Sequence, residues 1–267
     1  ILLFSLVWGL TLGSIGEGGR GFMQDLQQVG MENFWSAFLG GVIFNASNIL
    51  LSASMSLAGM SVAFPIGVGL ALVLGVFVNY FSVPKGDPVT LFGGVFLTVR
   101  KRGVLIAVCA GILMAFFYRF VAAAMDLENL ESPAVGMMTP YSALFVFAIG
   151  IFISNFLFNS LLMRKPFTGV PVAYSQYFKG NMNTHLVGIF GGAIWALGTA
   201  CSYIAAGTAG AAISYGLGQG ATMVAALWGV FIWKEFKGAS KSTNLLIALM
   251  FILFILGLAL IITSGGN

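Results

Sequence analysis

Charged side chains are scarce in this sequence. Asp, Glu, Lys and Arg together make up 7% of the 267 residues, whereas hydrophobic residues make up 59%. A soluble domain holds about 25% charged residues, so the composition excludes a protein whose main solvent is water. It predicts a polytopic helical membrane protein, because lipid requires each backbone polar group to be paired within its own segment. The apolar runs are continuous rather than alternating, which excludes a transmembrane barrel.

Cysteine, histidine and acidic residues are also few. The two cysteines, Cys109 and Cys201, lie in apolar runs and match neither a disulfide pattern nor a metal-ligand spacing. The single histidine is His185, and all eight acidic residues lie in loops or at segment ends. No nucleophile–base set and no nucleotide-binding loop is present. We therefore expect no enzyme activity, metal or cofactor. The net charge of +4 does not indicate nucleic-acid binding, because the basic residues cluster at segment ends.

Several apolar runs are long enough to cross a membrane, for which a helix needs roughly 20 residues. The predicted crossings are residues 34–57, 59–82, 103–125, 140–163, 184–207, 209–233 and 244–264. Residues 1–14 begin inside such a run without the basic stretch of a signal peptide, so we expect helical sequence upstream of Ile1. Residues 16–33 are predicted to form a polar loop. Residues 89–99 are too short to span, and we interpret them as a truncated helix with residues missing before Arg100; a re-entrant half-helix is the alternative.

The two halves of the chain resemble each other. An offset of 151 positions superposes Gly40-Gly41 on Gly191-Gly192 and Ala58-Gly59 on Ala209-Gly210. A repeat with an odd number of crossings inverts one half relative to the other, as in many transporters. We therefore predict a ten-helix bundle of two inverted five-helix repeats. The first repeat is residues 1–99, lacking its first helix and part of its fifth, and the second is residues 103–264.

Basic residues near the crossings predict the orientation. The richer side holds residues 100–102, 164, 165, 179, 234, 237 and 241, whereas the other holds Arg20 and Lys85. The first group is expected to be cytoplasmic, which places both termini outside the cell membrane.

A polar stripe in the first half has a counterpart in the second. Asn45, Asn48 and Ser52 share one helix face. At the repeat offset, Phe44 corresponds to Trp195, Asn48 to Thr199 and Ser52 to Tyr203. Neutral hydrogen-bonding groups beside aromatic rings suit an uncharged polar solute. The alternative is that these groups only bond neighbouring helices together.

Further polar residues inside the apolar runs are candidates for the same pathway. They are Tyr215 and Gln219, Asn155 with Asn159, and Arg119. A charge inside a membrane segment is a functional hypothesis by default, although Arg119 could instead extend toward the acidic loop at 126–131. Gly59, Pro65 and Gly210 are candidate hinges, with close helix packing as the alternative role of the small residues.

Short motifs carry a resemblance to a known family. They are GGVIFNASNILLS, AGMSV and VNYF in the first half, and TPYSALFVF, GGAIWALG and WGVFIWKEFKGASK in the second. With the inverted five-helix plan they resemble the drug/metabolite transporter superfamily, and within it the ureide permease family and its bacterial relatives. The resemblance implies import of a small neutral polar solute, such as a ureide or nucleobase, by alternating access across the plasma membrane, which in a bacterium is the inner membrane.

The resemblance leaves alternatives open. Sugar-uptake permeases share the architecture, and a membrane scaffold or receptor is the non-transport alternative. Whether a coupling ion, H⁺ or Na⁺, takes part is also open.

Overall fold

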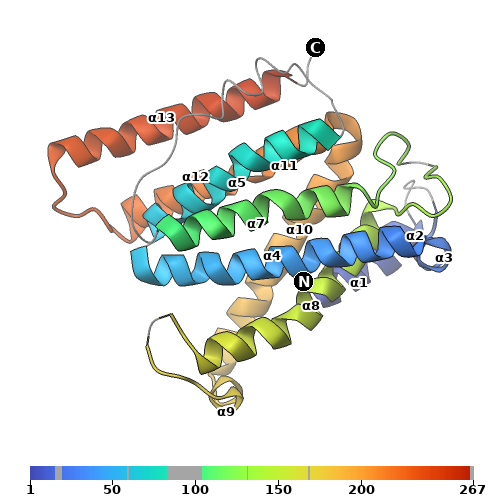
Figure 1. Cartoon of the computed structure of the whole chain (residues 1–267), viewed down its shortest axis with the longest axis horizontal. Coiled ribbons are helices and arrows are strands. Elements are labelled where there is room, and N and C mark those ends of the chain that lie inside the picture. The colour runs from blue at the N-terminus through green and yellow to red at the C-terminus, as the bar shows by residue number, and fades with distance from the viewer. Residues whose placement is uncertain (16–19, 59, 83–103, 131, 168, 265–267) are drawn as a thin grey trace. The chain divides into compact units, whose positions relative to one another are not determined.

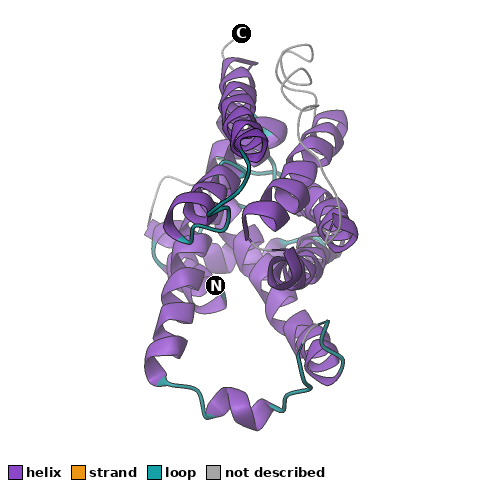
Figure 2. Ribbon diagram, turned by 90° about the vertical axis from the view of Figure 1, so that its left-hand side faces the viewer, coloured by secondary structure: helices purple, strands orange, loops and turns teal. Residues whose placement is uncertain are grey.

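The computed structural model describes residues 1–15, 20–58, 60–82, 104–130, 132–167 and 169–264 (Figure 1). Every regular element in these ranges is a helix, and the sole extended feature there is an isolated bridge between Met125 and Met138 (Figure 2). The prediction of an all-α chain is confirmed. The expected segments 89–99 and Arg100–Arg102 lie outside the described residues.

The long helices follow the apolar runs. They are α4 (Met31–Ala58), α5 (Met60–Ser82), α7 (Val104–Ala122), α8 (Pro140–Arg164), α10 (Met182–Ala209) and α13 (Lys241–Ser264). The short ones are α1 (Leu2–Leu10), α2 (Leu12–Ile15), α3 (Phe22–Gln28), α9 (Tyr174–Phe178), α11 (Ala211–Gly218), α12 (Ala221–Leu227) and the π-helix η1 (Trp228–Ile232).

Five stretches of the described chain are long and apolar enough to cross a membrane, judged by length and composition. They are Met31–Leu57, Pro140–Arg164, Met182–Ala209, Ala211–Ile232 and Lys241–Ser264. The chain therefore has the character of a multi-pass membrane protein. The fuller ten-helix arrangement stays a prediction.

The prediction of a polar loop at residues 16–33 is wrong for most of residues 20–33, the part of this segment that the structure describes. α3 occupies Phe22–Gln28, and α4 begins at Met31. Phe22 is fully buried, and its ring lies edge-on to Phe145, with centroids 5.4 Å apart. This short helix depends on contacts with a distant part of the chain, which local polarity does not reveal.

The crossing predicted at 209–233 is a broken helix. α11 ends at Gly218, α12 begins at Ala221, and the last turns form η1. In the turn, the Thr222 amide donates to the Gln219 carbonyl at 2.9 Å, a three-residue spacing in place of the helical four. Gly218 and Gly220 flank Gln219, and each glycine in a helix interior costs roughly 0.5–1 kcal/mol relative to alanine.

The chain forms two compact units. Unit 1 comprises residues 1–46 and 120–208, in which α1 and α3 pack against α8. Unit 2 comprises residues 47–119 and 209–267, in which α5 packs along α11 and α12, and α11 contacts α13. Each unit takes residues from both predicted repeats. The division of the sequence into 1–99 and 103–264 remains a prediction about internal similarity.

Candidate functional site

An aromatic cluster lies inside unit 1. Phe44 of α4 packs against Trp195 of α10, with ring centroids 4.7 Å apart and ring planes tilted by 33°. Phe147 of α8 lies 5.4 Å from Phe44 and 6.2 Å from Trp195, nearly parallel to the indole. Tyr203, two turns beyond Trp195 on α10, meets Phe147 edge-on at 6.1 Å. Three of these four residues were predicted from the repeat, and the structure brings them together.

Two glycines allow the helices that carry the cluster to approach closely. A Cβ atom on Gly41 of α4 would collide with the carbonyl oxygen of Phe147, and one on Gly150 of α8 would lie 3.2 Å from the Gly41 Cα. Such small-residue contacts are a usual means of packing helices in lipid. They set the position of Phe147 relative to Phe44, which lies one turn beyond Gly41.

Replacing Gly41 by alanine should destabilise unit 1. The added methyl meets backbone atoms that cannot move without displacing α8, and overpacking of this kind costs about 1–3 kcal/mol. We expect a lower melting temperature in detergent. Gly191→Ala is the matched control, because a Cβ on Gly191 meets nothing within 4 Å and alanine favours a helix. Equal melting temperatures for the two variants would contradict the close contact.

Polar groups flank the aromatic cluster. The Asn45 amide donates to Ser154 Oγ at 3.0 Å and to the Ile151 carbonyl at 3.4 Å, and Asn45 and Ser154 are both buried. Thr199 Oγ1 donates to the Trp195 carbonyl one turn back at 3.0 Å. The Asn45 bonds join α4 to α8, as the helix-packing alternative predicts. A direct role of Asn45 or Thr199 toward a solute stays a prediction.

Asn155 lies next to Ser154 on α8, and its side chain bonds to another residue of the same helix. The Asn159 amide donates to Asn155 Oδ1 at 2.8 Å, and both residues are half-buried.

The remaining candidates on α4 and α7 belong to unit 2. Asn48 is half-buried, and the exposed Ser52 donates its hydroxyl to the Asn48 carbonyl at 2.8 Å. Arg119 lies in the last turn of α7 with an exposed side chain, and no ion pair to it is present in the described part of the chain. A solute contact by these three residues stays a prediction.

Tyr215 is enclosed by the helices of unit 2. Its hydroxyl lies 3.0 Å from the Ala71 carbonyl of α5 and 3.1 Å from the Met114 carbonyl of α7. Gly75 leaves room for the ring, since a Cβ there would collide with it, and Tyr118 meets the ring edge-on at 5.3 Å. These contacts join α11 to α5 and α7. A solute contact by Tyr215 stays a prediction.

The hinge candidates differ in what the structure says of them. Gly59 lies outside the described residues, and α5 is helical through position 65. Gly210 separates α10 from α11 with φ +84°, a value that L side chains rarely adopt. Gln219 lies in the turn between α11 and α12, where its backbone N–H donates to the Tyr215 and Gly216 carbonyls.

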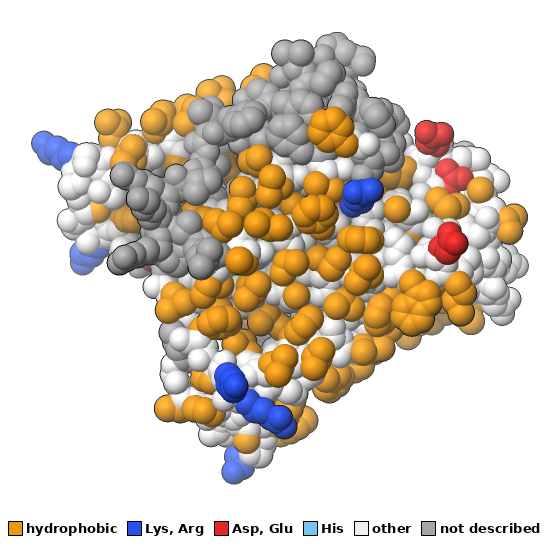
Figure 3. All heavy atoms as spheres, in the orientation of Figure 1, with side chains coloured by type: hydrophobic (Ala, Val, Ile, Leu, Met, Phe, Trp, Pro, Cys, Tyr) orange, Lys and Arg blue, Asp and Glu red, His pale blue; other side chains and the backbone are white. Residues whose placement is uncertain are grey.

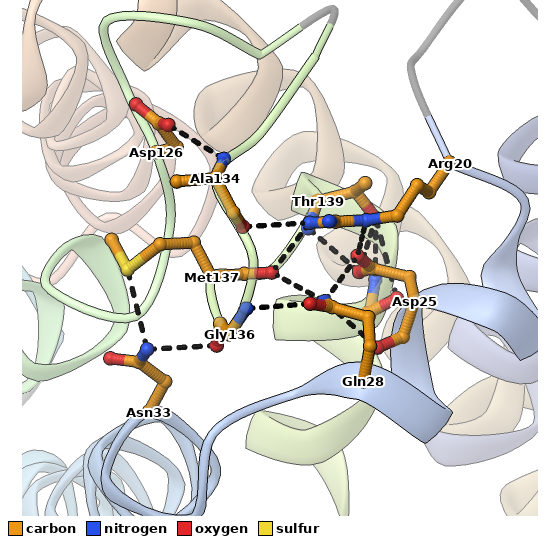
Figure 4. Close-up of polar contacts among 10 residues, drawn as sticks. Arg20, Asp25, Gln28, Asn33, Asp126, Ala134, Gly136, Met137 and Thr139 are labelled. Atoms are coloured by element: carbon orange, nitrogen blue, oxygen red, sulfur yellow. Dashed lines mark hydrogen bonds and ion pairs between the residues drawn. The ribbon is translucent and has the colours of Figure 1, made fainter.

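A buried carboxylate forms a second cluster in unit 1, drawn in Figure 4. Asp25 is fully buried and accepts four hydrogen bonds. Its Oδ1 receives Arg20 Nε at 3.1 Å and Gln28 Nε2 at 3.2 Å. Its Oδ2 receives the Thr139 amide at 2.8 Å and the Thr139 hydroxyl at 3.0 Å. We call these residues the Asp25 network.

The Asp25 network positions the start of α8. Thr139 is the N-cap of this helix, and its side chain accepts from the Ser142 amide. Arg20 also donates to the Met137 carbonyl at 3.0 Å, and Gln28 Nε2 reaches the same oxygen at 2.9 Å. The carboxylate thus orients the helix that carries Phe147 two turns further on.

Sequence reasoning missed Phe147 and Asp25. Phe147 is one aromatic residue in a uniformly apolar run, so no periodic signal sets it apart. Asp25 was assigned to a loop, and its partner Thr139 is 114 residues away. The mapping of Phe44 onto Trp195 at the repeat offset was the one signal that pointed to this part of the molecule.

The helical architecture and the site define the class of protein. The described chain has five candidate membrane spans, and its aromatic cluster is neutral, flanked by an amide and hydroxyl groups. These features define a helical, multi-pass membrane protein with a neutral aromatic cluster in unit 1.

Comparison with known proteins identifies the family. The ureide permease family model matches residues 96–264. This chain is 20% identical to ureide permease 1 of Arabidopsis thaliana over 340 aligned positions, which cover all of this chain and 87% of that relative. Over 166 positions it is 25% identical to ureide permease 2 and 24% identical to ureide permease 4 of the same plant, spanning 62% of this chain and 42% and 41% of those relatives. No solved structure matches significantly.

The chain belongs to the ureide permease family. Members of this family are transporters rather than enzymes.

Proposed function

We propose that the chain carries a small, neutral, polar solute of the ureide or nucleobase type across the plasma membrane. Its family membership and the names of its Arabidopsis relatives support this substrate class. The single structural observation that carries the proposal is the close packing of the Phe44, Phe147 and Trp195 rings.

The chemistry of the cluster fits such a solute. Ureides and nucleobases have flat rings with several N–H and C=O groups, and flat rings stack on aromatic side chains. Trp195 is half-buried, so part of its indole remains open to contact. Thr199 lies one turn beyond Trp195 on α10, so its hydroxyl is on the same face of the helix as the indole. An uncharged site also matches a solute without net charge.

Transport by alternating access between inverted repeats is part of the proposal. α4 and α10 both have 28 residues, and each is followed after one residue by the next helix. Their boundaries differ by the same offset of 151 positions that relates the two halves of the sequence. Gly210 supplies a position at which the chain direction can change between α10 and α11. The basic side, which includes Lys234 and Lys241, is proposed to be cytoplasmic.

Reconstituted protein tests the substrate class. We expect proteoliposomes holding the full chain to accumulate labelled allantoin or uracil, and an excess of unlabelled ureide to compete with the label. Hexose should not compete. Competition by hexose alone would favour the sugar-uptake function, and an absence of any flux from correctly inserted protein would contradict a transporter. Varying the pH or the sodium gradient in the same vesicles identifies a coupling ion.

A further inference from the structure

The connector between α8 and α10 is basic. Arg164, Lys165 and Lys179 are all exposed, and the sequence holds no Asp or Glu from position 132 to position 234. No acidic side chain of the connector offsets these charges. Figure 3 shows Lys and Arg side chains beside hydrophobic ones in this part of unit 1.

The same connector exposes large aromatic rings. Tyr177 is 61% exposed and Phe178 is 76% exposed, both on α9, and Phe167 is 49% exposed. Exposed apolar surface of this kind marks an interaction site. Aromatic rings beside Lys and Arg are typical of segments that lie at the level of lipid headgroups.

The connector is folded back onto the end of α8. The Val172 amide donates to the Met163 carbonyl at 3.0 Å, and the Tyr174 hydroxyl lies 2.8 Å from Ser160 Oγ. Tyr177 packs edge-on against His185 at the start of α10, with ring centroids 4.9 Å apart. In Figure 2, α9 lies between the ends of α8 and α10. Because both neighbours are candidate membrane spans, these contacts hold the rings and charges next to the ends of those spans.

We propose that residues 164–167 and 169–179 form a binding surface for the headgroups of anionic phospholipids. The lipid phosphates would contact Arg164, Lys165 and Lys179, and the rings of Tyr177 and Phe178 would enter the boundary between headgroups and acyl chains. Charge complementarity selects an anionic lipid over a zwitterionic one. The anchoring of the connector to two membrane helices favours lipid over a soluble acidic protein. The proposal requires membrane insertion but not the transport function proposed above.

Hydrogen exchange in nanodiscs tests this surface. The full chain is placed in discs of phosphatidylcholine, with or without phosphatidylglycerol, and exchange is followed in peptides covering residues 173–182. We expect several-fold slower exchange when phosphatidylglycerol is present. The triple variant R164Q/K165Q/K179Q should lose this difference, since each basic side chain near an anionic surface contributes roughly fivefold in affinity.

The control is K234Q/K237Q/K241Q, which removes the same charge from a different exposed connector and should keep the protection. K179Q alone should reduce the protection given by phosphatidylglycerol at least twofold. This single variant tests the proposal if the triple variant does not fold. Equal exchange in both lipids, or protection that survives R164Q/K165Q/K179Q, would overturn the proposal. So would protection in phosphatidylcholine discs on addition of inorganic phosphate or a soluble acidic peptide.

Discussion

Replacing Trp195 by alanine is expected to weaken solute uptake by roughly 5- to 150-fold. Stacking of a flat ring on an aromatic side chain is worth about 1–3 kcal/mol, and each 1.4 kcal/mol is a factor of about ten in affinity. Trp195 has the closest ring contact of the cluster, at 4.7 Å from Phe44. The change should appear as a higher half-saturation concentration for uptake of a labelled ureide or nucleobase in proteoliposomes.

Two further variants make this result specific. Trp195→Phe keeps a flat ring and should retain most of the affinity. Trp233→Ala removes an equally large side chain that is 58% exposed, and it should leave uptake unchanged. If Trp195→Ala protein inserts, melts like the unchanged protein and shows the same half-saturation concentration, the aromatic cluster is not where the solute binds.

Asp25→Asn is expected to destabilise the protein by about 3–5 kcal/mol, the usual cost of removing one partner of a buried ion pair. All four groups that contact the carboxylate are donors, so an amide NH₂ faces two donors whichever way it turns. Arg20 also loses its charge partner while only 24% of its side chain is exposed. A much lower melting temperature in detergent is the expected reading.

Glu32→Gln is the control for this variant, because it neutralises an acidic side chain that is exposed in the first turn of α4. It should melt with the unchanged protein. An Asp25→Asn protein that also melts within about a degree of the unchanged protein would show that the Asp25 network contributes little to the fold.

The positions of the long helices could be predicted because apolar length alone determines them in lipid. The sequence offset of 151 positions pairs Phe44 with Trp195, and the two rings lie 4.7 Å apart, although the repeat itself stays a prediction. Phe147 could not, because it reaches the cluster only through the close contact of Gly41 with α8, which is a tertiary feature.

Polar residues inside apolar runs were harder to interpret. Asn45 and Tyr215 were both predicted to face a solute, and both make hydrogen bonds to neighbouring helices. A sequence cannot tell these uses apart, because an unpaired polar group in lipid needs a partner wherever that partner lies. For Tyr215 the partners are backbone carbonyls of Ala71 and Met114, which any residue type could supply.

The backbone contact of Gly41 with Gly150 determines which helices can move against each other. Because no side chain separates α4 from α8 at this point, sliding or rolling one along the other would drive backbone into backbone, so we expect the two helices to move together. α10 has no such lock at Gly188, Gly191 or Gly198, where an added Cβ would meet nothing within 4 Å. If transport separates the Phe44 ring from the Trp195 ring, we expect α10 to shift relative to α4 and α8, while α4 and α8 keep their mutual contact.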